Sequence, residues 1–107
     1  MTERLIDHVD ATSAQGEQIK AIVSSYAPRL EETKNAHLDN RTAFTQTLTQ
    51  TSIDRDKLET LRQSELALLN SNSQALVEMI ADIADVLTPE QRQELASDIK
   101  ERSHHWH

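Results

Sequence analysis

The strongest constraint on the fold is a stripe of apolar residues in the second half of the chain. Between residues 58 and 87, large apolar side chains recur three or four positions apart, or at sums of these spacings, over about eight helical turns. An α-helix places such positions on one face, whereas a strand requires alternation. The spacing therefore predicts one long amphipathic helix, and its stripe consists of Leu58, Leu61, Leu68, Leu69, Leu76, Met79, Ile80, Ile83, Val86 and Leu87.

A second long helix is predicted from Thr12 onward, because the same spacing recurs there. Pro28 lies inside this pattern and has no amide to donate to the carbonyl of Ser24, so we expect a bend or a split into two helices. Asp54 is typical of a helix N-cap and places the turn between the two helices at residues 47–53. An antiparallel, bent hairpin follows, and the first helix contributes Ile19, Ile22, Val23, Tyr26, Leu30, Leu38, Phe44 and Leu48.

Shorter helices are expected at both ends of the chain. Residues 3–9 form a brief amphipathic segment, and a last helix restarts at Thr88 and runs to about Arg102. With one glycine and two prolines, the chain has too few turn residues for a β-sandwich or barrel. The fold class predicted is all-α with four helices, in a single domain spanning residues 1–107.

Composition excludes several classes of function. A net charge of −7 argues against a nucleic-acid partner, which would require clustered lysine and arginine. There is no cysteine, so neither a disulfide framework nor a thiolate zinc site is available. No apolar run is long enough to insert into a membrane, and the beginning of the sequence lacks the apolar segment of a signal peptide. If the protein is exported, we expect this sequence to be its mature part.

Two helix starts carry the same four-residue capping box. In Thr12-x-x-Gln15 and in Leu87-Thr88-x-x-Gln91, the threonine hydroxyl accepts from the glutamine amide and the glutamine side chain reaches back to the threonine amide. Pro89 takes the first helical position, where its missing amide costs nothing. The pattern alone is unspecific, since residues 47–50 and 60–63 match it too. Its context, one box at each end of a long hairpin, raises its specificity.

This arrangement resembles the Spy/CpxP family, also called LTxxQ proteins, over nearly the whole chain. The residues from Leu87 to Gln91 match the family's second box closely, whereas Ala11 stands where the first box usually has leucine. The resemblance implies a cradle-shaped homodimer and a periplasmic stress protein that binds unfolded or misfolded polypeptide without ATP. An envelope stress sensor is a further partner that it implies.

The resemblance also assigns candidate client-binding residues. They are the apolar and basic positions near the first box, together with Arg29, the first residue of a basic cluster that extends to Arg62, and the neighbouring Leu30. The full set is Ile6, Val9, Ile19, Lys20, Val23, Arg29 and Leu30. The alternative interpretation places Ile19 and Val23 in the hairpin core, where apolar residues at helical spacing usually lie.

Histidines suggest a second function. His104, His105 and His107 end the chain, and Glu101 lies one turn before His104, so the tail could bind zinc, copper or nickel. Family relatives of the CnrX and ZraP kind sense or bind divalent metal. Alternatively, these imidazoles complement the helix dipole or belong to a cloning remnant. For His37 we expect a polar contact facing the hairpin rather than a metal ligand.

No required cofactor and no catalytic site is predicted. Ser103 lies beside His104, but no positioned acid and no oxyanion-forming turn accompany this pair. A glycine-rich phosphate loop is impossible in a chain whose single glycine is Gly16. The sequence therefore predicts a binding protein, either a chaperone or a metal-responsive sensor or buffer, and not an enzyme.

Overall fold

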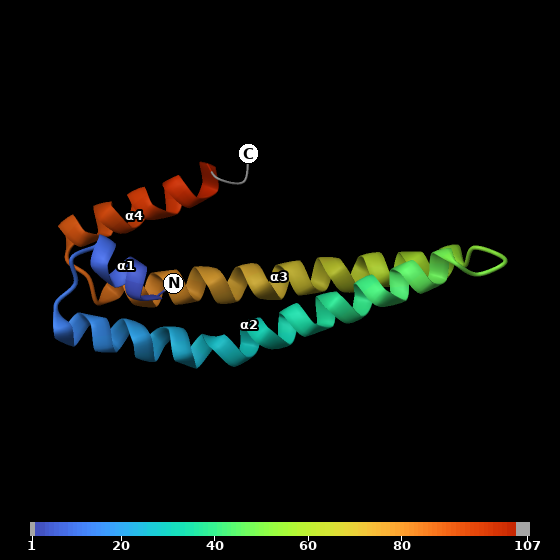
Figure 1. Cartoon of the computed structure of the whole chain (residues 1–107), viewed down its shortest axis with the longest axis horizontal. Helices are drawn as coiled ribbons and strands as arrows, with labels where there is room; N and C mark the ends of the chain where they lie inside the picture. The colour runs from blue at the N-terminus through green and yellow to red at the C-terminus, as the bar shows by residue number, and fades with distance from the viewer. Residues whose placement is uncertain (1, 105–107) are drawn as a thin grey trace. The chain divides into compact units, whose positions relative to one another are not determined.

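The computed structural model describes residues 2–104, with side chains up to Arg102, and over this range it contains only helices and their connections (Figure 1). In chain order the helices are α1 (Thr2–His8), α2 (Ser13–Leu48), α3 (Arg55–Asp85) and α4 (Pro89–His104). Two long helices are flanked by two shorter ones. The predicted all-α fold class is confirmed.

Helix α2 is continuous through Pro28, so the predicted alternative of a split into two helices is wrong. Proline cannot donate to the carbonyl of Ser24, but the neighbouring turns carry additional bonds from side chains. The Ser25 hydroxyl donates to the Ile22 carbonyl at 2.7 Å, and the Thr33 hydroxyl donates to the Arg29 carbonyl at 3.1 Å. The missing amide donor at Pro28 does not end α2, because the helix packs against α3 both before and after this residue.

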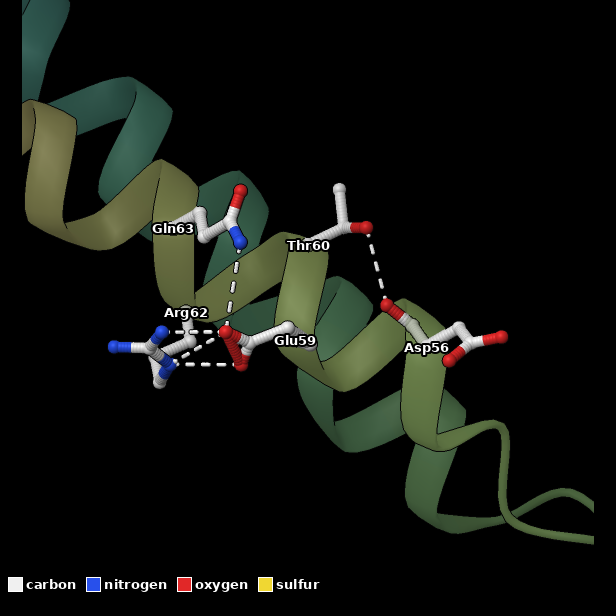
Figure 2. A network of polar contacts seen from close by, with 5 residues as sticks. All are labelled: Asp56, Glu59, Thr60, Arg62 and Gln63. Atoms are coloured by element: carbon white, nitrogen blue, oxygen red, sulfur yellow. Dashed lines mark hydrogen bonds and ion pairs between the residues drawn. The ribbon is translucent and has the colours of Figure 1, made fainter.

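Helix α3 begins where the sequence predicts. The Asp54 carboxylate caps it by accepting from the Lys57 amide at 3.0 Å. Figure 2 shows the polar contacts of the next turns, in which the Arg62 guanidinium donates to both carboxylate oxygens of Glu59. This bond lowers the pKa of Glu59 and raises that of Arg62. The charge of Arg62 is thus already engaged within its own helix.

The chain forms two compact units, and both contain parts of α2 and α3. The first, here called the terminal unit, comprises Met1–Tyr26 and Glu78–His107; the second, the hairpin unit, is Ala27–Val77. The change from one unit to the other along α2 falls beside Pro28.

A hydrophobic core lies in the terminal unit. Val9 and Ile19 are fully buried there, and α1 packs against α4. Partly buried apolar residues from α1, α2, α3 and the connections after α1 and α3 surround this core, and α4 contributes the buried Leu95. The Tyr26 hydroxyl donates to the Asp82 carboxylate at 2.7 Å. The buried residues of the core are Val9, Ile19, Ile83, Leu87 and Leu95.

The hairpin unit consists of the adjoining parts of α2 and α3, which run antiparallel to each other. The loop that connects them is drawn in green in Figure 1. Among its described apolar residues, only Leu61 and Ala75 are buried. Within residues 2–104, no helix combines the length and the apolar character that a membrane crossing requires.

Candidate functional site

Both capping boxes form as predicted, with nearly identical geometry. The Gln15 amide donates to the Thr12 hydroxyl at 3.1 Å, and the Thr12 amide donates to Gln15 Oε1 at 2.9 Å. The corresponding distances between Thr88 and Gln91 are 3.2 and 2.9 Å. Each box therefore satisfies two amides at the start of its helix that have no partner within the helix.

The two boxes are also bonded to each other through their glutamines. Gln15 Nε2 donates to Gln91 Oε1 at 2.8 Å, and Gln91 Nε2 donates to Gln15 Oε1 at 2.9 Å. This reciprocal amide pair joins residues that lie 76 positions apart. The sequence showed two boxes but not their contact.

The second hydrogen of each glutamine amide is used at the end of another helix. Gln15 Nε2 donates to the Val86 carbonyl at 2.9 Å, directly after α3, and Gln91 Nε2 donates to the Asp10 carbonyl at 3.2 Å, two residues after α1. Val86 lies two residues before Thr88 and Asp10 two residues before Thr12, so each glutamine bonds the chain that leads into the other box. Each amide thus makes four hydrogen bonds, the full capacity of its donors and acceptor lone pairs.

The connection before the first box has a defined backbone conformation. Asp10 has a φ of 56°, in the left-handed region, and lies two residues after the end of α1. The Ala11 amide donates to the Ile6 carbonyl and the Asp10 amide to the Asp7 carbonyl, which is the bonding pattern of a Schellman C-cap. This turn aims the Asp10 carbonyl toward Gln91.

The residue before each threonine packs into the core. Leu87 is buried, and Ala11, which replaces the usual leucine of the first box, packs against the same core with its smaller side chain. The substitution keeps the cap. The motif residues Thr12, Gln15, Leu87, Thr88 and Gln91 therefore form one structural joint, in which the carbonyls and amides of helix ends satisfy each other.

The candidate client-binding residues fall into two groups. Val9 and Ile19 are only 1% and 0% exposed, so in this structure they are core residues and not open to a client, as the alternative interpretation holds for Ile19. Val23 and Ile6 are half-buried against that core. Lys20 is exposed in the terminal unit, whereas Arg29 and Leu30 belong to the hairpin unit, exposed and half-buried respectively.

A surface that sequence reasoning missed lies on the hairpin unit. Nine large apolar side chains are exposed among the described residues, and Ile99 alone of these belongs to the terminal unit. Helical spacing in the sequence does not show how much of an apolar stripe is covered by a partner helix. The sequence therefore did not predict that these side chains are exposed. Its side chains are Leu38, Phe44, Leu48, Ile53, Leu66, Leu69, Leu76 and Val77.

Polar side chains connect α2 and α3 in the middle of the hairpin unit. His37 Nδ1 lies 2.7 Å from Glu65 Oε2, which confirms the expected hairpin-facing contact of this histidine. Asn40 Nδ2 donates to Glu65 Oε1 at 3.0 Å and to the Ser64 hydroxyl at 2.8 Å. The bond from Asn40 is the largest cause of a lowered pKa for Glu65; desolvation opposes it and His37 adds to it.

The metal-binding prediction concerns the end of the chain. Helix α4 continues to His104, but the side chain of His104 and all of His105 and His107 lie outside the described residues. Within the part that is described, no three histidine, aspartate or glutamate side chains converge to hold a metal ion.

Fold and site together define a four-helix protein whose helix ends are joined by two interlocked Thr-x-x-Gln boxes. The chain belongs to the LTXXQ motif family, whose model matches residues 2–98. This is the Spy/CpxP type of family, and its members are in general periplasmic, stress-related and known as non-enzymatic chaperone-like proteins. No curated protein and no solved structure matches the chain at a significant level.

Proposed function

We propose that this protein is a periplasmic chaperone that binds unfolded or misfolded polypeptide without ATP. The observation that supports this function best is the concentration of exposed apolar side chains on the hairpin unit. Single exposed apolar residues are normal on any protein surface, but eight within one two-helix unit, seven of them on α2 and α3 and one in the connecting loop, favour a role in binding. A two-helix hairpin has no third layer with which to cover them.

The charge distribution allows anionic clients to approach the hairpin unit more easily than the net charge of the chain indicates. The terminal unit has five lysines and arginines against eleven aspartates and glutamates, whereas the hairpin unit has six against seven. Because like charges slow encounter, anionic clients are repelled by the terminal unit and much less by the hairpin unit. Ile6, Lys20, Val23, Arg29 and Leu30 remain proposed client contacts.

We further propose that the protein is a homodimer. A hairpin unit with two buried apolar residues leaves more apolar surface than one chain covers, and self-association would bury part of it. An envelope stress sensor is proposed as a second class of partner, on the basis of the family alone.

The test is suppression of aggregation of a reduced, unfolding model client, followed by light scattering in the presence of EDTA. The metal-free protein is expected to suppress scattering, and the triple variant Leu66→Ser, Leu69→Ser, Val77→Ser is expected to lose most of this effect. Ile99→Ser serves as the matched control, because it removes an exposed apolar side chain from the terminal unit.

The assay also separates the chaperone from the metal-responsive alternative. Activity of the metal-free protein that is unchanged when zinc, copper or nickel is added in excess over the chelator supports the chaperone. A metal-free protein that does not suppress aggregation, combined with stoichiometric metal binding that is lost when His104, His105 and His107 become alanine, would favour the sensor or buffer.

A further inference from the structure

Two neighbouring cavities lie in register along one face of the hairpin unit. The first has a volume of about 360 Å³ and the second about 300 Å³, and both are lined by His37 and Glu65. The first continues toward Leu30 on α2 and Asn72 on α3, the second toward Phe44 and Leu58. They therefore form one groove, here called the hairpin groove, which the His37–Glu65 contact divides in the middle.

Each half of the groove combines apolar walls with a cation. Leu68 and Leu69 line the first cavity together with Lys34, and Phe44 and Leu61 line the second together with Arg41. Neither Lys34 nor Arg41 makes an ion pair or side-chain hydrogen bond with any residue from 2 to 102. Arg62 also lines the second cavity, but Glu59 already binds it (Figure 2).

The spacing of the two halves restricts the conformation of a ligand. Lys34 and Arg41 are seven residues apart on α2, which corresponds to about 10.5 Å along the helix axis. A bound helix presents residues i and i+7 on one face at this same distance. An extended chain would need three residues for about 10 Å, and residues i and i+3 of a strand point to opposite faces.

From these observations we propose that the hairpin groove binds an acidic amphipathic helix of a partner protein. Two apolar side chains at positions i and i+7 fill the two cavities, and acidic side chains beside them pair with Lys34 and Arg41. This inference rests on the proposed function in that it assigns a site and a ligand class to polypeptide binding. A net charge of −7 taken alone would favour cationic partners, because like charges weaken encounter, and the cations of the groove are the local exception.

The test measures fluorescence anisotropy of a labelled helical peptide of about 18 residues, long enough to be helical in isolation. The probe has leucines at i and i+7 with a glutamate beside each. One control peptide carries the leucines at i and i+5, which lie on different faces, and another replaces the glutamates by lysines. Tighter binding of the first peptide than of either control, by about tenfold, is expected.

Variants of the protein locate the site. Leu69→Ala and Phe44→Ala, which are 64% and 44% exposed in the wild type, are each expected to weaken binding about tenfold without loss of folding. Leu66 and Val77, which are 52% and 66% exposed, lie outside the groove, so Leu66→Ala and Val77→Ala are expected to change the affinity less than about twofold.

Charge reversal tests the cations. The double variant Lys34→Glu, Arg41→Glu is expected to abolish the salt dependence of binding, whereas Arg55→Glu, Lys57→Glu makes the same charge change outside the groove and retains it. Equal affinity for the i+5 peptide, or equal losses from Leu66→Ala and Leu69→Ala, would overturn the proposal.

Two further measurements separate this proposal from the proposed function. If the wild type binds no helical peptide and Leu69→Ala suppresses aggregation as well as the wild type does, the groove is not a helix site, and the proposed chaperone function is retained. If peptides bind as expected but no client is protected, the groove stands and the chaperone fails. A dimer that Leu69→Ala and Phe44→Ala dissociate in sedimentation velocity would mean that a second copy fills the groove, which overturns the partner helix.

Discussion

The terminal unit and the hairpin unit share two helices but use their apolar residues differently. In the terminal unit the ends of α2 and α3 meet two additional helices, and five large apolar side chains are buried. In the hairpin unit the same helices have only each other, and eight large apolar side chains stay exposed. Two helices can bury one stripe at their seam, and a third layer is needed to bury more.

The difference separates the tasks of stability and binding. The terminal unit contains the core and the joint formed by Gln15 and Gln91, in which helix ends satisfy each other's backbone groups. The hairpin unit has the groove, with Lys34 and Arg41 in its two halves, and most of the exposed large apolar side chains among the described residues. A substitution should therefore affect folding in one unit and binding in the other, and each of the following experiments tests this division.

The largest effect is expected from the core of the terminal unit. Ile19→Ala removes a side chain that is 0% exposed, so it should lower the free energy of unfolding by about 3 to 4 kcal/mol through lost burial and a cavity. Leu66→Ala, at a position 52% exposed in the hairpin unit, should change it by less than about 0.5 kcal/mol. Urea unfolding followed by circular dichroism measures both, and equal losses would contradict the division.

A smaller loss is expected from the glutamine joint. Gln91→Ala removes the partner of the Thr88 amide and leaves the Asp10 carbonyl and the Gln15 side chain without theirs, which should cost about 2 kcal/mol. Gln93→Ala, an exposed glutamine two residues later on α4, is the matched control and should be nearly neutral. The joint would be dispensable if the two variants unfolded at the same urea concentration.

A gain in stability is expected at Gly16. A Cβ at this buried position would meet Ile6 Cγ2 at 3.5 Å and Cδ1 at 3.7 Å, which are ordinary contact distances. Alanine also reduces the conformational entropy of the unfolded chain, so Gly16→Ala should raise the free energy of unfolding by about 0.5 to 1 kcal/mol. A higher melting temperature by calorimetry checks this expectation. A decrease would show that the contact between α1 and α2 is tighter than these distances indicate.

The smallest effect concerns the pH dependence of the hairpin unit. Since the folded pKa of Glu65 lies below its ordinary value of 4.5, the carboxylate stabilises the fold above that pH and loses this contribution as the pH falls through the folded value. The side chain is 39% exposed, which limits the contribution to below about 1 kcal/mol.

The measurement compares wild type with Glu65→Gln by urea unfolding at about pH 5.5 and about pH 3.5. Their difference in free energy of unfolding should shrink at the lower pH, because in the wild type the unfolded state takes up a proton at Glu65 before the folded state does. A difference that stays constant or grows would mean that the bonds from Asn40 and His37 do not favour the carboxylate.

Local chemistry in the sequence was sufficient for the helices and their starts. Helical spacing predicted α2 and α3, and the caps at Thr12, Asp54 and Thr88 lie where the structure has them. These features depend on residues within four positions of each other, so the sequence contains all the information. The polar contact of His37 with the hairpin was predicted for a similar reason, since its position on the helix face follows from periodicity.

Only the tertiary structure decided which apolar residues are buried and which stay exposed. Val9 and Ile19 were candidate client contacts in the sequence and are core residues, whereas Leu69 belongs to the predicted apolar stripe and is exposed. The reciprocal bond between Gln15 and Gln91 joins positions 76 apart and could not be found either. Periodicity tells which side chains share a face of a helix, but burial depends on whether another helix lies against that face, and this is settled by contacts between distant segments.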